Sequence, residues 1–210
     1  MPKTYNQIAG QRPQRIEAIS DGVFAVAITL LVLDIKVPVS EAIKSEHDLM
    51  VAFCSITPKL LTYFLSFMTL GIFWTGQSAQ YIYIEKSDRN LNWLTLFFLM
   101  IVSLVPFTTA FLSEHLNFKF ALVLYWLNIF LLGFSLYIHW AYASKKHFIN
   151  IEGEERSVID KAMKRRIVGG QTLYALGACL CLINNYVSIA AIIIVQLNYA
   201  LGVFSPRSKK

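Results

Sequence analysis

The chain of 210 residues is poor in charge, because Asp, Glu, Lys and Arg together make up only 15% of it. Soluble domains carry about 25% charged residues. Hydrophobic residues make up 56% of the chain, far more than one soluble core can bury. The composition therefore excludes an ordinary soluble domain. It predicts an all-α integral membrane protein, since helices satisfy their own backbone hydrogen bonds in lipid.

Cysteine and catalytic motifs are also scarce. The three cysteines, Cys54, Cys179 and Cys181, lie in apolar segments and predict neither a disulfide framework nor a metal motif. The sequence has no HExxH, GxSxG, Walker or dinucleotide motif. It also has no TVGYG-like filter and no arginine-rich voltage sensor. We therefore expect no enzyme activity, no cofactor and no resident metal.

What the chain has instead is a series of long apolar segments. A helix needs about 20 such residues to cross a bilayer. Six segments are present, which predicts six transmembrane helices in a single membrane domain over residues 1–210. Their approximate ranges are 15–37, 50–83, 91–112, 118–143, 167–183 and 186–204. The second is long, so its start either projects above the membrane or the helix is tilted. The short link at Asn184 and Asn185 predicts an antiparallel hairpin of the last two.

Lysine and arginine are distributed unevenly between the segments. Fifteen fall in the N-terminus, the second loop, the fourth loop and the C-terminus, and four fall on the other side. This asymmetry predicts that both termini lie in the cytoplasm of a protein in the cell membrane. It also accounts for the net charge of +6 without nucleic acid, which we do not expect as a partner.

A polar motif, RIEAISDG, stands at the start of the first apolar run. The run 22–33 covers about 18 Å, too short for a hydrocarbon core of about 30 Å. The segment 15–37 covers about 34 Å, so we expect the motif to be helical and partly at membrane depth. The alternative is that Ser20, Asp21 and Gly22 form a turn or helix cap.

A helical wheel at about 100° per residue separates two faces of this segment. One face gathers around Asp21 and comprises Glu17, Phe24, Ala25, Ile28 and Val32. The other comprises Arg15, Ile19, Gly22, Val26, Thr29, Leu30, Leu33 and Val37. Because a carboxylate in a membrane needs partners, we expect Asp21 to anchor the helix to its own subunit. Direct contact of Asp21 with an ion and a gating network are the alternatives.

These residues resemble the lysosomal potassium channel family, transmembrane protein 175, in its prokaryotic form. RIEAISDG is similar to the family signature Arg-x-x-x-Phe-Ser-Asp, and VFAVAITLLVLDIKVP is similar to its first helix. The stretch NWLTLFFLMIVSLVPFTTAFLSEH resembles its third span. Three positions depart from the pattern: Ile19 replaces the signature Phe, Gln77 an expected His, and Thr95 a frequent Asn.

The resemblance implies a potassium-preferring cation channel that assembles in the lipid bilayer as a homotetramer, with K⁺ as the permeant ion. The first helix would line the pore, with an aliphatic constriction in place of a carbonyl filter. The positions that match the family's pore-lining residues are Val26, Thr29, Leu30 and Leu33. Val26 is smaller than the usual family residue. The positions that match the signature and the network orienting the helix are Arg15, Ser20, Asp21, Gly22 and Trp74.

Two other functions stay open at this stage. A proton-coupled secondary transporter would use Asp21 and Glu17 to bind the coupling ion. Neither the repeats nor the broken helices typical of carriers are evident, although Pro106 and the pair Gly169-Gly170 could bend helices. A membrane enzyme or a structural membrane protein is the third reading, without a catalytic constellation to support it. Unitary currents would favour a channel, and saturable uptake lost in Asp21→Asn would favour a carrier.

Overall fold

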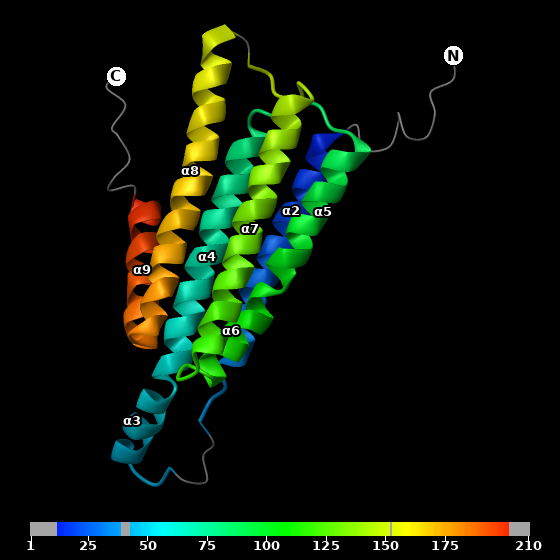
Figure 1. The fold of residues 1–210 in the computed structure, drawn as a ribbon. Coiled ribbons are helices and arrows are strands. Elements are labelled where there is room, and N and C mark those ends of the chain that lie inside the picture. The colour runs from blue at the N-terminus through cyan, green and yellow to red at the C-terminus, as the bar shows by residue number, and fades with distance from the viewer. Residues whose placement is uncertain (1–11, 39–42, 152, 202–210) are drawn as a thin grey trace.

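The computed structural model describes residues 12–38, 43–151 and 153–201, and these residues form a bundle of helices (Figure 1). The only β pairing among them is an isolated bridge between Ile84 and Ile149. The helical elements are α2 (Pro13–Leu30), η1 (Leu31–Asp34), α3 (Glu46–Ser55), α4 (Thr57–Tyr81), α5 (Arg89–Ser103), α6 (Val105–Glu114), α7 (Lys119–Lys145), α8 (Gly153–Cys179), η3 (Leu180–Leu182) and α9 (Asn185–Leu201).

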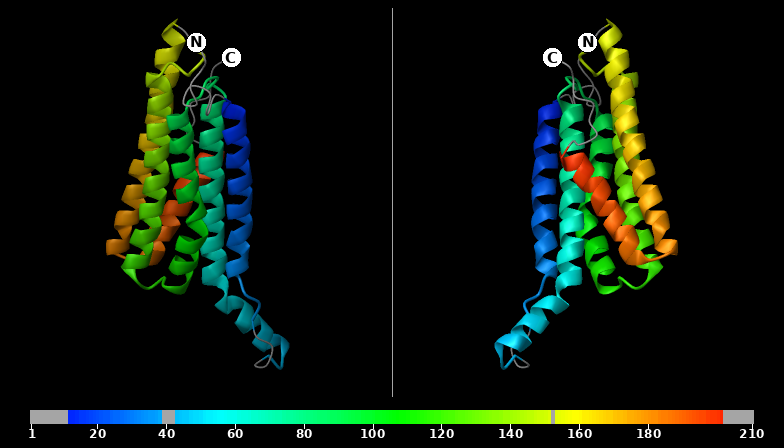
Figure 2. Two further views of the ribbon diagram at one scale, coloured as in Figure 1. Left: turned by 90° about the vertical axis from the view of Figure 1, so that its right-hand side faces the viewer. Right: turned by 90° about the vertical axis from the view of Figure 1, so that its left-hand side faces the viewer.

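The long helices run side by side, and α7 packs against both α5 and α8 (Figures 1 and 2). Helix α2 packs against α4 and α5 at one edge of the bundle, whereas α8 and α9 pair at the opposite edge. The last two helices form the antiparallel hairpin expected from the link at Asn184, which confirms that prediction. The first and last described helices have their outer ends toward the same end of the bundle.

Two of the expected spans are broken, and a proline follows each break. Helices α3 and α4 meet at Ile56 with a bend of 43°, and Pro58 occupies the first turn of α4. Helix α5 ends at Ser103, and Pro106 occupies the first turn of α6. Proline has no N–H to donate, so a new helix can start there but an old one cannot continue regularly. The second span's long start is therefore a separate helix that projects from the bundle (Figure 1).

Among the described residues, three helical segments are long and apolar enough to cross a membrane, namely Pro13–Asp34, Arg89–Glu114 and Lys119–Lys145. The bent pair of α3 and α4 makes a fourth. Helix α9 is apolar but has 17 residues, and α8 begins in a charged sequence and projects beyond its neighbours. By length and composition, three of the six expected spans are thus present, or four if the bent pair counts as one span. The last one was expected to reach residue 204, which lies outside the described residues.

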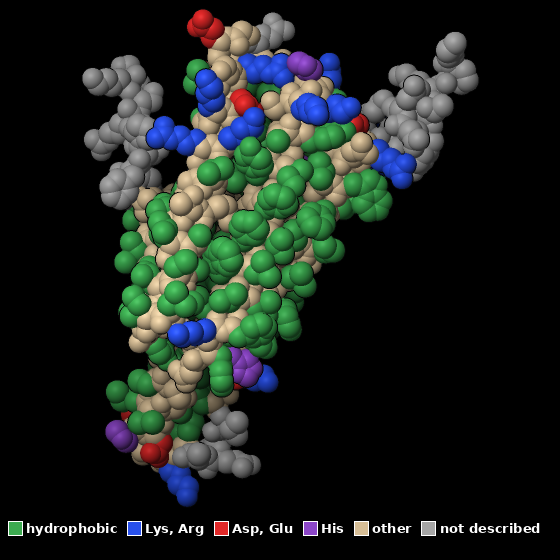
Figure 3. Space-filling view, viewed as in Figure 1, with side chains coloured by type: hydrophobic (Ala, Val, Ile, Leu, Met, Phe, Trp, Pro, Cys, Tyr) green, Lys and Arg blue, Asp and Glu red, His purple; other side chains and the backbone are tan. Residues whose placement is uncertain are grey.

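Charged and hydrophobic side chains are distributed over the surface as expected for a membrane protein. Lys and Arg gather at the end where α8 begins, while hydrophobic side chains cover the middle of the same face (Figure 3). The core contains two apolar clusters, one large and one at the α8 end around Trp140. Polar side chains are also buried in the bundle, and Tyr125, Ser66, Thr69 and Gln196 connect α7, α4 and α9 by hydrogen bonds.

Candidate functional site

Helix α2 has a buried face and an exposed face. Its buried positions are Pro13, Ile16, Ser20, Phe24 and Ala27, and Leu31 continues them into η1. Large aliphatic side chains cover the other side: Val26 is 57% exposed, Leu30 44% and Leu33 69%. Within one subunit, this stripe therefore has little to pack against.

Thr29 lies on the same exposed side of α2. Its hydroxyl donates to the backbone oxygen of Val26 at 2.9 Å. A hydroxyl oxygen has one hydrogen and two lone pairs, so donating to the helix leaves the oxygen free to accept. The structure thus brings the four predicted pore-lining residues, Val26, Thr29, Leu30 and Leu33, together on the exposed surface of the first span, which α2 and η1 form.

The polar motif ahead of this stripe binds α4. Asp21 Oδ1 accepts a hydrogen bond of 2.8 Å from the indole Nε1 of Trp74. One residue earlier, the buried Ser20 hydroxyl donates to the Ile16 backbone oxygen at 2.9 Å. The same hydroxyl oxygen accepts a hydrogen bond of 3.3 Å from Gln77 Nε2. The motif is helical, which excludes the turn alternative, and two of its residues bond to α4.

The rotation of α2 differs from the wheel in one respect. Asp21 was expected at the centre of the face turned to its own subunit, together with Ala25 and Val32. Both of these are exposed, and the buried face is centred near Ser20, about 100° from Asp21. Asp21 therefore lies at the edge of the contact with α4. The wheel missed this because it was centred on the charged Asp21, whereas the buried residue that bonds to α4 is the uncharged Ser20.

The other motif residues are placed less centrally. Arg15 and Gly22 are exposed on α2, and Glu17 is half-buried. A Cβ added at Gly22 would have no neighbour within 4 Å, so no close packing in this chain requires a glycine there. Only Ser20, Asp21 and Trp74 of the five predicted network residues come together through the hydrogen bonds described.

Two positions that depart from the family pattern take part in this buried network. Gln77 supplies the donor to Ser20 and is itself buried. Thr95 on α5 pairs with the Tyr81 hydroxyl at 3.0 Å and donates to the Leu91 backbone oxygen. The departures therefore substitute one hydrogen-bonding side chain for another.

The opposite end of the first span carries a polar cluster that the sequence did not single out. The Ser113 hydroxyl donates to Asp34 Oδ2 at 2.8 Å, which joins η1 to α6. Lys59 at the start of α4 pairs with Glu114. Both contacts join residues more than fifty positions apart, so no local spacing could have indicated them. The first span is thus held by hydrogen bonds near both ends.

No group of three or more His, Cys, Asp or Glu side chains among the described residues is arranged to hold a metal ion. The three cysteines are free thiols. The first span is instead anchored to α4 by polar side chains. Its exposed face is aliphatic and carries one hydroxyl, that of Thr29.

Comparisons with known proteins agree with this description. The family model for the endosomal/lysosomal potassium channel TMEM175 matches residues 15–106. A potassium channel of Chamaesiphon minutus is 30% identical over 190 residues, which cover 89% of this chain and 93% of that protein. A potassium channel of Streptomyces collinus is 44% identical over 103 residues, but they cover only 49% of this chain and 48% of that protein.

Solved structures give the same result. The crystal structure of a TMEM175 homologue from Chamaesiphon minutus, described as a lysosomal potassium-selective channel, aligns with a TM-score of 0.78 and 28% identity. The alignment covers 90% of this chain and 96% of that one. A crystal structure of the potassium channel MtTMEM175, at 18% identity and a TM-score of 0.60, shares the fold.

These findings define a multi-pass, all-helical membrane channel. The chain belongs to the TMEM175 family of potassium channels, as its first-span motif indicated. This family is one of ion channels, so the protein is not an enzyme.

Proposed function

We propose that the protein is a potassium-preferring cation channel that works as a homotetramer, with α2 of each copy lining a central pore. The bacterial relatives named above are called potassium channels, and the Chamaesiphon homologue is described as potassium-selective. The vertebrate relatives, including the human one at 35% identity over 110 residues, are called endosomal/lysosomal proton channels. Potassium is therefore the permeant ion we propose, and protons are the competitor that experiments need to include.

One observation carries this proposal: the exposed aliphatic face of α2. Val26, Leu30 and Leu33 are each 44% exposed or more, whereas Phe24, Ala27 and Leu31 on the same segment are at most 2% exposed. Four copies of α2 around an axis would cover the exposed stripe. They would also place side chains of the same kind in rings, as a constriction requires.

The mechanism follows from the chemistry of such rings. A narrow ring of leucine side chains has no groups that hydrate an ion, so it loses its water when it closes. An ion that crosses the open ring must shed part of its hydration shell. K⁺ holds its water less tightly than Na⁺, so the ring disfavours Na⁺. The Thr29 oxygen, with its proton donated to Val26, would replace part of the lost water.

The geometry of Asp21 supports the channel over a carrier. A carrier that used Asp21 and Glu17 would need a carboxylate free to bind and release the coupling ion. One oxygen of Asp21 is already bonded to Trp74 at 2.8 Å. This pairing suits an orienting role better than ion turnover.

We further propose that α8 and α9 complete six spans and that both termini face the cytoplasm at the cell membrane. The asymmetry of fifteen against four Lys and Arg residues supports this orientation. The α8 end of the bundle, where Lys and Arg gather in Figure 3, would then be the cytoplasmic end.

Ion flux from proteoliposomes tests the proposal. Leu30→Ala and Leu33→Ala should each raise K⁺ flux several-fold and bring the K⁺ to Na⁺ permeability ratio toward one, because a wider ring strips less water. Val32→Ala is the matched control: Val32 is 48% exposed on the same segment but lies outside the proposed lining face, and its change should alter neither quantity. Unchanged flux and selectivity in both leucine variants would refute the pore assignment.

A further inference from the structure

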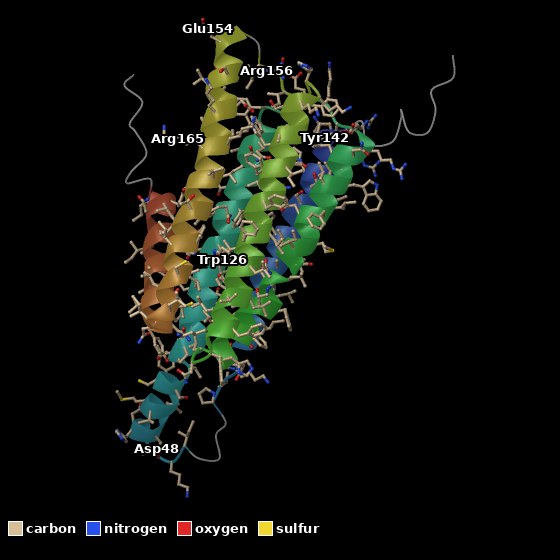
Figure 4. All side chains as sticks on the ribbon, viewed as in Figure 1. Asp48, Trp126, Tyr142, Glu154, Arg156 and Arg165 are labelled. Atoms are coloured by element: carbon tan, nitrogen blue, oxygen red, sulfur yellow. The ribbon has the colours of Figure 1, made fainter. Side chains whose placement is uncertain are left out.

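Three cationic side chains of α8, those of Lys161, Arg165 and Arg166, are exposed and form no ion pair within the described part of the chain. Lys164, in the same run, is paired with Asp160 at 2.7 Å. The neighbouring helix α9 contains no charged residue that could neutralise the other three. Figure 4 shows Arg165 pointing away from α7. The edge of the bundle formed by α8 and α9 therefore carries three uncompensated positive charges.

The acidic side chains at the start of α8 are remote from both arginines. Glu154 and Glu155 are about 15 Å or more along the helix from Arg165 and Arg166, at 1.5 Å per residue. Figure 4 shows Glu154 at the far end of α8. Exposed charges are largely screened from each other beyond about 8 Å at physiological ionic strength. These carboxylates therefore do not neutralise the arginines.

The arginines lie near a boundary of the hydrocarbon core. Lys59 of α4, paired with Glu114, marks the opposite boundary. Arg166 lines a cavity together with Ile72 and Gly76 of α4, which are about 20 and 26 Å along that helix from Lys59. Since the core is about 30 Å thick, the Arg166 backbone lies just inside the boundary at the α8 end. An arginine at this depth extends its guanidinium to the level of the phospholipid phosphates.

The cavity beside Arg166 is apolar and has a volume of about 90 Å³. It lies between α4, α7, α8 and α9, and Phe73, Leu136 and Ile167 are among its walls. Tyr199 of α9 also lines it, and its hydroxyl is 3.5 Å from the backbone oxygen of Arg166. Sites for whole small molecules measure about 300–1,000 Å³, so this cavity has room only for a segment of a chain.

We propose that the edge of α8 and α9 is a binding site for an anionic phospholipid, with its phosphate on Arg165 and Arg166 and part of an acyl chain in the cavity. Guanidinium groups bind phosphate oxygens through two parallel N–H donors each. A zwitterionic lipid would bring its own cation to three positive side chains, whereas phosphatidylglycerol brings one net negative charge. The inference rests on the proposed placement of α8 and α9 in the membrane and does not depend on the pore.

Native mass spectrometry of the whole purified protein tests this proposal. The lipid-depleted protein in detergent is titrated with phosphatidylglycerol or with phosphatidylcholine of the same acyl chains. Phosphatidylglycerol should bind at about tenfold lower concentration, as expected for two basic residues at an anionic head group. The double variant Arg165→Gln with Arg166→Gln should reduce that preference to about twofold or less.

The double variant Lys145→Gln with Lys146→Gln is the matched control, because it removes the same charge at the same end of the bundle. Both lysines are exposed, and Lys145 is about 39 Å along α7 from Lys119, well beyond the hydrocarbon core. A role in orienting the protein is served equally by these lysines, so only a binding site distinguishes the two variants. The control should keep the preference for phosphatidylglycerol.

Three results would overturn the proposal: equal binding of the two lipids, equal loss in the arginine and lysine variants, or displacement of bound phosphatidylglycerol by soluble glycerophosphate. The last result would assign the site to a free phosphate compound. If the double arginine variant does not fold, each single arginine variant should lose about threefold of the preference. Because the readout is lipid binding and not ion flux, a failure of this inference is distinguishable from a failure of the proposed channel function.

Discussion

The indole of Trp74 donates a hydrogen bond of 2.8 Å to the carboxylate of Asp21 and so joins the first span to α4. The bond sits at the edge of the buried face of α2, beside the Gln77 to Ser20 contact. We propose that it fixes the rotation of α2 about its own axis. That rotation determines which side chains of α2 are presented on the exposed side.

Trp74→Phe removes the donor and leaves Asp21 without its partner. We expect a loss of about 0.5–1.5 kcal/mol in stability, as for a hydrogen bond at an exposed site, and altered K⁺ flux because α2 is no longer held in one rotation. Thermal unfolding in detergent and proteoliposome flux measure the two effects. Trp93→Phe is the control, since Trp93 is 60% exposed and makes none of the hydrogen bonds described. If Trp74→Phe and Trp93→Phe have the same unfolding temperature and the same K⁺ flux, the hydrogen bond to Asp21 contributes to neither.

Tyr125→Phe tests the buried network between α4, α6, α7 and α9. The Tyr125 hydroxyl contacts Ser66 at 3.1 Å and Thr69 at 3.0 Å, and Gln196 on α9 donates to Thr69 at 2.7 Å. Removing the hydroxyl should lower stability by about 1–2 kcal/mol, because two neighbouring groups lose a partner at a buried site. The readout is the midpoint of thermal unfolding. Tyr137→Phe on the same helix should leave that midpoint unchanged, and a similar drop there would remove the network as the cause.

Gly133→Ala should separate α7 from α8. The added Cβ would lie 1.8 Å from Gln171 Nε2, so the amide must leave its bond to Ile129. We expect a fall of several degrees in the unfolding midpoint. Gly169→Ala on α8 has no neighbour within 4 Å of the added Cβ and should be neutral or slightly stabilising, since alanine favours helix over glycine. A stable Gly133→Ala protein would contradict the close contact at Gln171.

Asp160 gives a pH-dependent prediction at the charged start of α8. Burial alone would raise the pKa of this carboxyl, but the hydrogen bond and charge of Lys164, with the Trp140 indole at 3.0 Å, lower it overall. Because the pKa is lower in the folded state, ionised Asp160 stabilises the folded protein at any pH above its unfolded pKa, about 3.9. That stabilisation is lost as the pH falls through the folded-state pKa.

Asp160→Asn should therefore lower the unfolding midpoint at neutral pH by an amount that corresponds to about 1 kcal/mol or less, since the site is partly exposed. The difference from the unaltered protein should close as the pH drops below the ordinary range of an aspartate. Unfolding midpoints of both proteins across the pH range measure it. A difference that stays constant with pH would assign the effect to something other than the carboxylate charge.

Much of the fold was predictable because the apolar runs are long. Four spans have the expected composition, and the polar motif is helical as its length required. The breaks were less predictable: Pro58 and Pro106 mark where helices restart, and the bend at Ile56 is 43°. A pattern of hydrophobicity has no information on that angle.

The anchor of α2 was predicted only in part. Asp21 indicated the need for partners, but the centre of the contact is Ser20, whose side chain is small and uncharged. The buried contacts of Gln196 with Thr69, 127 positions away, also escaped prediction. A single polar residue within an apolar run indicates that the side chain needs a partner. The partner lies on another helix, and the sequence does not specify on which helix.

The most direct test of the central claim is a structure of the purified protein in lipid nanodiscs by electron cryomicroscopy. We expect four copies around one axis, with Leu30 of α2 and Leu33 of η1 nearest to that axis and Asp21 turned toward Trp74 of its own subunit. An axis lined by any other helix, or an assembly without four copies, would contradict the account.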